Sequence, residues 1–199
     1  SEEAIFFVTG DVIVSYARTQ LALRDREQLG SSVGQIHAAA LDRHSRLVVA
    51  GEHGLARLSA SRSSLQVIAT GAAYHVLVPH MDGMFAVGSE QLTSWRDGED
   101  SALHVPAPRP MAPADAMLIG GELVVLDGGA GLALWDVRHA RAPVWRGDVR
   151  HPGLTPFDAA VATPQGIMTS SGDLMAVADA VTDATLIHEP PLMLGASSS

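Results

Sequence analysis

The apolar residues of this chain come in short runs separated by glycine-rich or polar turns, and the pattern is clearest between Met117 and Val137. Three apolar runs alternate there with two turns, in the order Met117–Ile119, Gly120-Gly121, Leu123–Leu126, Asp127–Gly131 and Leu132–Val137. Links this short cannot hold the crossover that parallel strands need, so the pattern predicts three antiparallel strands. No long stretch keeps the i, i+3, i+4, i+7 spacing of an amphipathic helix without Gly or Pro, and we therefore expect an all-β fold.

The same pattern recurs along the whole chain. The third run of each unit begins at a leucine, and these leucines are 34, 37, 40 and 42 residues apart: Leu21, Leu55, Leu92, Leu132 and Leu174. A fourth apolar run follows most units, at Leu65–Ala69, Ala102–Val105, Pro143–Val149 and Thr185–His188, with a weak candidate at Glu27–Leu29 in the first unit. Four strands in a repeat of about 40 residues are the signature of a β-propeller blade.

These repeats predict a β-propeller of about five four-stranded blades. We expect one domain over residues 1–194 and a flexible tail over 195–199, with the blades at 1–33, 34–71, 72–110, 111–151 and 152–194. The pattern leaves three arrangements open: a closed five-bladed ring, part of a larger propeller, or a propeller that another chain completes. An open arc would expose the apolar face of a blade, which favours association.

The second unit, Ile36–Ser59, resembles a WD40 repeat, in which a strand, an SPDG-like turn, a small-residue strand and a second turn lead to a strand that ends in Trp-Asp. Pro79–Gly83 is similar to the SPDG turn, and Trp135-Asp136 is a literal Trp-Asp end. The family's Gly-His pair is missing, because His37 and His75 each lie one residue inside their strands. Its internal His–Ser/Asp–Trp hydrogen-bond relay is therefore not expected in its usual form. The resemblance implies a non-catalytic scaffold without a cofactor that binds a protein or peptide partner.

Polar residues gather in the turns between the second and third strands of each unit. In a propeller these turns lie on one face around the central channel, so we expect the partner to contact them. An outer strand carries Trp145, and an exposed tryptophan is a frequent binding anchor. The expected contact residues are Arg18, Glu52, His53, Glu90, Gln91, Asp127, Asp173 and Trp145. By contrast, Trp95 and Trp135 occupy one repeat position and are expected to pack between blades.

Two other kinds of chemistry, sugar hydrolysis and metal binding, are conceivable for the polar side chains of this chain. The turn carboxylates could act as an acid–base pair in a sugar-binding or glycoside-hydrolysing propeller, although acidic residues are also ordinary in turns. These carboxylates are Glu52, Glu90, Asp127 and Asp173. The nine histidines show no spacing that would hold a metal, since His75 and His80 should lie at opposite ends of one strand.

The formal net charge of −9 repels phosphate backbones and anionic lipids, so we expect neither a nucleic-acid partner nor a membrane partner. One local exception is a basic stretch that could dock an acidic partner loop or form a solvated outer strand: Arg138, Arg141, Arg146 and Arg150. The chain has no cysteine, which excludes disulfides and Cys-ligated zinc. No apolar run approaches the ~18–20 residues of a membrane span. The acidic start Ser1–Glu3 lacks the basic region of a secretory signal, so a cytoplasmic location is expected.

Overall fold

The structure of the protein is a computed structural model that describes residues 4–17, 23–28, 30–58, 65–99, 101–128, 131–149, 160–163, 166–169 and 174–175. These residues are mostly strands, with one short helix, α1 (Gly30–Val33), between the first two sheets. The strands make five antiparallel sheets, which confirms the all-β prediction. Within the described ranges, no helix is long and apolar enough to cross a membrane.

Each sheet takes its strands from one stretch of chain, and strands that follow each other in sequence are neighbours in the sheet. The first sheet contains β1 (Ala4–Thr9), β2 (Val12–Ala17) and β3 (Leu23–Gln28). The second contains β4 (Ile36–Leu41), β5 (Leu47–Gly51), β6 (Gly54–Leu58) and β7 (Leu65–Thr70). The third contains β8 (Tyr74–His80), β9 (Gly83–Gly88), β10 (Gln91–Arg96) and β11 (Leu103–Pro106).

The last two sheets follow the same plan. The fourth sheet contains β12 (Pro113–Ile119), β13 (Glu122–Asp127), β14 (Gly131–Asp136) and β15 (Val144–Val149). The fifth contains β16 (Ala160–Thr163), β17 (Gly166–Thr169) and β18 (Leu174–Met175). Each sheet falls within one of the residue ranges expected for the units, while the candidate strand Thr185–His188 and the tail 195–199 lie outside the described residues.

Two-residue turns join the first and second strands of the first, third and fourth sheets, where the sequence predicts turns. Thr9 pairs with Val12 across the first such turn, and Ile119 pairs with Glu122 across the turn in the fourth sheet. Gly10 and Gly120 begin these turns at φ values of +58° and +60°, a left-handed conformation that glycine adopts without strain. The glycines therefore set the length of the turn, and the turn length sets the register of the two strands.

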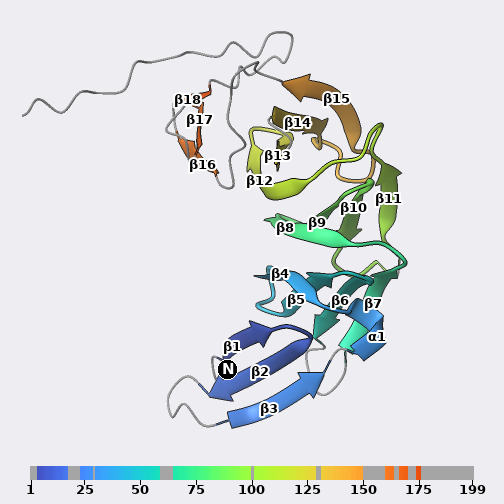
Figure 1. Cartoon of the computed structure of the whole chain (residues 1–199), viewed down its shortest axis with the longest axis vertical. Helices are drawn as coiled ribbons and strands as arrows, with labels where there is room; N and C mark the ends of the chain where they lie inside the picture. Colours follow the sequence, from blue (N-terminus) through green and yellow to red (C-terminus); the bar gives the residue numbers. More distant parts are fainter. Residues whose placement is uncertain are drawn as a thin grey trace, which may run out of the picture.

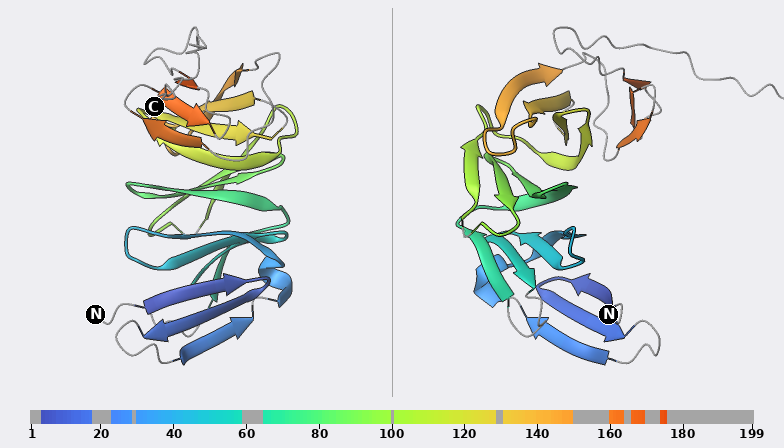
Figure 2. Two further views of the ribbon diagram at one scale, coloured as in Figure 1. Left: turned by 60° about the vertical axis from the view of Figure 1, so that its left-hand side comes forward. Right: turned by 180° about the vertical axis from the view of Figure 1, so that it is seen from behind.

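The five sheets stack one after another in an open arc (Figure 1). The first strand of each sheet lies on the inner side of the arc, where β4 and β12 both contact β8 (Figure 1). The fourth strands β7, β11 and β15 lie on the outer side, and Figure 2 shows the same order from two further directions. The first and fifth sheets stand at opposite ends of the arc, so the described strands do not close a ring (Figure 1).

The first sheet departs from the four-strand pattern. Its third strand, β3, covers Leu23–Gln28, while Leu21 at the start of the expected run lies outside the described residues. Glu27 and Gln28 pair with β2 as part of this strand. The weak candidate for a fourth strand at Glu27–Leu29 is therefore the end of the third strand, as far as the described residues extend.

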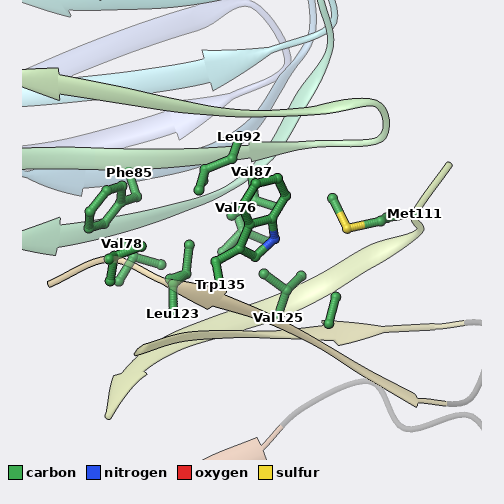
Figure 3. Packing of buried hydrophobic residues seen from close by; sticks show 11 residues of the cluster. Val76, Val78, Phe85, Val87, Leu92, Met111, Leu123, Val125 and Trp135 are labelled. Atoms are coloured by element: carbon green, nitrogen blue, oxygen red, sulfur yellow. The ribbon is translucent and has the colours of Figure 1, made fainter. Parts of the chain in front are cut away.

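The largest apolar cluster lies between the third and fourth sheets (Figure 3). Trp135 of β14 is fully buried there and packs among Phe85 and Leu92 of the third sheet and Leu123 of its own sheet. Trp95 is buried in a separate cluster with Met84 and with Val48 of the second sheet. Both tryptophans thus pack between sheets, which confirms the role predicted from their shared repeat position.

Candidate functional site

Apart from Trp145 on β15, the residues predicted to contact a partner belong to the turns between second and third strands, which we call the predicted face. Glu52, His53 and Glu90 are exposed on these turns. Gln91 is half-buried, and its Nε2 donates a hydrogen bond of 2.5 Å to the hydroxyl of Tyr74. Two further turn residues, Arg18 and Asp173, lie outside the described residues.

Asp127 of the predicted face is buried and takes part in an internal contact. Its carboxylate accepts hydrogen bonds from the Ala112 backbone N–H at 3.0 Å and from Arg109 Nη1 at 2.5 Å. Arg109 also donates through Nε to Asp148 of β15 at 2.8 Å, and this hydrogen bonding raises the pKa of Arg109 above its usual value. Arg109 thereby ties the segment between the third and fourth sheets to both β13 and β15.

Trp145, the predicted surface anchor, is half-buried in the same region. Its ring meets that of Trp135 edge-on, with centroids 5.0 Å apart at 90°, and the Arg109 guanidinium carbon is 5.9 Å from its centroid. Asp127 and Trp145 thus lie near each other because both contact Arg109, and this contact stabilises the fourth sheet internally. Sequence reasoning missed Arg109, which is surrounded by prolines and carries no repeat signal.

A chain of hydrogen bonds crosses the third sheet. From Gln91 it passes to the Tyr74 hydroxyl, then to Thr93 Oγ1 at 2.8 Å, and from Thr93 Oγ1 to His104 Nδ1 at 2.9 Å. Burial raises the pKa of Tyr74, so this hydroxyl stays neutral. The sheet thus contains a different polar relay from the His–Ser/Asp–Trp relay of the WD40 family.

Two histidines meet on the inner strands of the second and third sheets. His37 and His75 approach to 3.2 Å between their Nδ1 atoms, and His75 Nε2 lies 3.2 Å from Ser89 Oγ. Burial, together with the neighbouring His37, lowers the pKa of His75. His75 and His80 lie at opposite ends of β8, and no group of three or more possible metal ligands occurs within the described ranges.

A cavity of about 570 Å³, which we call the cleft, opens between the third and fourth sheets at the opposite end of the strands. It lies among the turns that join first to second and third to fourth strands, and we call this end of the sheets the cleft face. Its lining residues are His80, Met81, Asp82, Phe85, Arg96, Leu118, Gly120, Gly121, Val137, Arg138, His139, Ala140 and Arg141.

The apolar part of the cleft combines a buried base with exposed walls. Phe85 and Val137 are buried, at 1% and 7% exposure. Leu118 is 36% exposed, and Met81, in the β8–β9 turn, is 85% exposed. Met81 and Leu118 both line the cavity and are both exposed, so an incoming apolar group could contact the two side chains together.

Arginines from both neighbouring sheets line the cleft. Arg96 of the third sheet pairs with Asp82 at 2.7 Å, while Arg138 and Arg141 of the fourth pair with Asp136 and Glu99. Hydrogen bonds from Arg138 hold the pKa of Asp136 well below its usual range. These ion pairs orient the guanidinium groups around the cavity.

A buried ion-pair network lies between the second and third sheets, next to the cleft. The Asp97 side chain is only 4% exposed and pairs with Arg46, with Arg57 Nη1 at 3.3 Å and with Arg43 Nε at 2.9 Å. Arg57 also lies over the Trp95 ring at 4.5 Å, and burial lowers the pKa of Arg57. The network holds the β10–β11 loop, and thus one side of the cleft face, against the second sheet.

Comparison with known proteins gives matches only among solved structures: no family model and no curated protein matches the chain. U3-55K aligns with a TM-score of 0.61 at 12% identity, over 88% of this chain and 57% of that chain. The WD40 repeats of RRP9 align with a TM-score of 0.60 at 14% identity, over the same shares of the two chains. The extracellular domain of BT4673 from B. thetaiotaomicron aligns with a TM-score of 0.64 at 10% identity, over 83% of this chain and 24% of that chain.

The fold is that of a WD40-like β-propeller. At these identities the likeness shows the fold alone. The chain spans 57% of U3-55K and of the RRP9 repeats, and about a quarter of BT4673. Together with the open arc, these shares fit part of a larger propeller rather than a closed five-bladed ring (Figure 1).

Proposed function

We propose that this propeller is a non-catalytic interaction scaffold and that a peptide segment of a partner protein binds in the cleft. The observation that carries the proposal is the exposed pair Met81 and Leu118 beside a cavity of about 570 Å³. Concave sites of this size with apolar walls and a few convergent polar groups are where proteins bind ligands. Arginines at the rim of such a site supply orientation and specificity.

The predicted face supports this function less well. Among its described residues, Asp127 and Gln91 are engaged in internal hydrogen bonds. The predicted anchor outside this face, Trp145 on β15, packs against Trp135. A sugar-active propeller would need free carboxylates and an accessible aromatic ring at this face. The exposed pair Glu52 and Glu90 remains there as a prediction, which the following experiment includes as its control.

Peptides that bind the wild-type chain should lose at least tenfold in affinity when Met81 is replaced by Asp. Met81 is 85% exposed, so the change should leave the melting temperature unaltered while it places a carboxylate in the apolar part of the cleft. Leu118→Asp should act in the same direction. The peptides are selected from a phage-displayed random library on the immobilised chain, and affinities are measured by fluorescence polarisation.

The matched controls are Glu52→Gln and Glu90→Gln, which lie in exposed turns of the predicted face. Their affinities should equal that of the wild-type chain. If the selected peptides instead bind Met81→Asp normally and lose affinity for the Glu52 or Glu90 variants, the predicted face is the binding site and the cleft is not.

A second candidate function is a structural one, in which another chain completes the propeller. The first sheet favours it, because Phe7 and Leu23 are 57% and 62% exposed on the side that faces away from the second sheet. Phe7 packs edge-on against Tyr16 with centroids 5.5 Å apart, and Tyr16 pairs with Leu23 across the strands. The other side of this sheet, with Ile13, packs on the second sheet.

If this apolar face associates, the isolated chain should show a mass above 20.8 kDa that rises with concentration in light scattering. Phe7→Thr combined with Leu23→Thr should return it to the monomer mass, since threonine keeps β-propensity and removes the apolar surface. A wild-type chain that stays monomeric at every concentration would rule out self-association through this face.

A further inference from the structure

The charge of the cleft distinguishes it from the rest of the molecule. The chain has 22 acidic and 13 basic residues, but the cleft is lined by three arginines and a single aspartate. We infer that the cleft takes an extended segment of a partner protein in which aspartate or glutamate flanks a bulky apolar side chain. This inference rests on the proposed function and adds the chemical class of the partner.

The arginines have capacity for further carboxylates. Asp136 is shared by Arg138 and Arg146, the latter at 2.6 Å. Asp82 is likewise shared by Arg96 and by Arg43, whose Nη1 lies 3.7 Å away. Arg43 also pairs with Asp97, and the Glu122 carboxylate acts on Arg138 and Arg146 as well, so the further capacity lies in the donors rather than in unpaired charge. Arg96 and Arg141 each make their ion pair through Nη2, and a guanidinium group carries five N–H donors. Guanidinium groups bind carboxylates through two parallel N–H donors, which makes an acidic side chain their natural ligand.

The exposure of these groups fits an incoming ligand. Arg138 and Arg141 have 64% and 71% of their side chains exposed, so a partner can reach them without breaking the fold. Gly121 allows Arg138 to lie across the β12–β13 turn, because a β-carbon at this glycine would come within 2.3 Å of Arg138 Cγ. The turn therefore supports the arginine stem against the wall of the cleft.

The order of charged and apolar groups across the cleft matches the inferred segment. Arg96 comes from the third sheet, while Arg138 and Arg141 come from the β14–β15 loop of the fourth. The apolar residues Phe85 and Leu118, one from each sheet, line the same cavity. An apolar side chain of the partner that enters the cavity would thus have an arginine of the third sheet and arginines of the fourth sheet around it. This arrangement favours a partner segment with acidic residues on both sides of the apolar residue.

The electrostatic contrast between the two faces adds specificity. The predicted face exposes Glu52 and Glu90, and the net charge of −9 repels acidic segments from most of the surface. Complementary charge at one site combined with repulsion elsewhere steers a partner to that site. Contacts of this kind between exposed charges weaken as salt is added.

The test uses the peptides selected on the full chain as described above, with their sequences as the first readout. We expect Asp or Glu on both sides of Leu, Ile, Met, Phe or Trp. Synthetic peptides in which Asn and Gln replace the acidic residues should bind at least tenfold more weakly, as should the double variant Arg138→Gln and Arg141→Gln. The charge reversal Arg138→Glu with Arg141→Glu should bind peptides in which Lys replaces the acids better than the original peptides.

The matched control for the double glutamine variant is Arg26→Glu, which makes the same change of net charge on β3 of the first sheet, where Arg26 is exposed. It should leave the affinity unchanged, and the melting temperatures of all variants establish that they are folded. Peptides that depend on Met81 or Leu118 but carry no excess of acidic residues, or that ignore the arginine variants, would overturn the inferred partner class alone. Selected peptides that depend on neither Met81 nor Leu118, or a selection that yields none, would overturn the proposed function itself.

Discussion

Replacing Asp97 with asparagine should lower the free energy of unfolding by about 3–5 kcal/mol, the usual cost of removing one partner from a buried ion-pair network. The Asp97 side chain is 4% exposed, and three arginines from the second sheet converge on it. Two of them, Arg46 and Arg57, are themselves largely buried, at 22% and 11% exposure. Without the Asp97 carboxylate, the buried carboxylate of Asp42 would be left to balance the charges of both Arg46 and Arg57 in a site that water reaches poorly.

Urea denaturation of the full chain measures this loss. Asp82→Asn is the matched control, because Asp82 also pairs with two arginines but its side chain is 44% exposed. Its replacement should cost only about 0–1 kcal/mol, as is usual for exposed ion pairs. Equal losses for the two variants would show that the burial of Asp97 does not control the energy of the network.

Replacing Trp135 with alanine should also lower the free energy of unfolding by about 3–5 kcal/mol, as large-to-small changes in a core do. Trp135 is fully buried between the third and fourth sheets, so its removal leaves a cavity where the two sheets meet (Figure 3). The same two sheets form the cleft, and we expect peptide binding to weaken in parallel with stability.

Trp145→Ala provides the comparison for this prediction. Trp145 is half-buried and lies at the margin of the same cluster. Its replacement should therefore lower the free energy of unfolding clearly less than the replacement of Trp135 does. Thermal and urea unfolding of both variants give the two values. If Trp145→Ala lowers the free energy of unfolding as much as Trp135→Ala does, or more, the fourth sheet is stabilised mainly through its outer strand.

The strands and turns of the described sheets could be predicted from the sequence because they depend on near neighbours. Glycines at Gly10 and Gly120 allow two-residue turns, and each such turn brings adjacent apolar runs into register. The positions of Trp95 and Trp135 in the repeat were also sufficient to predict burial between sheets, because equivalent positions in stacked repeats have equivalent surroundings.

Less of the candidate site could be predicted from the sequence. The sequence drew attention to Asp127 and Trp145, whose partner Arg109 lies in the proline-rich segment between the third and fourth sheets. It also singled out Arg138 and Arg141 as a basic stretch that could dock an acidic loop, and both line the cleft. Nothing in the repeat pattern indicated that Met81 and Leu118 would flank these arginines, because they belong to different sheets.

The sequence by itself thus determined the all-β fold, the propeller repeat and the turns, since these follow from alternation, glycine positions and a period of about 40 residues. Only the tertiary structure decided which charges meet. Asp97 pairs with Arg46, 51 positions away, because the stacking of neighbouring sheets brings their turns together. Arg109 pairs with Asp148 of β15, 39 positions away, because the segment between the third and fourth sheets lies beside that outer strand. The cleft has the same origin: it opens among the turns of two adjacent sheets, and its lining is set by packing between units rather than by the pattern within any one of them.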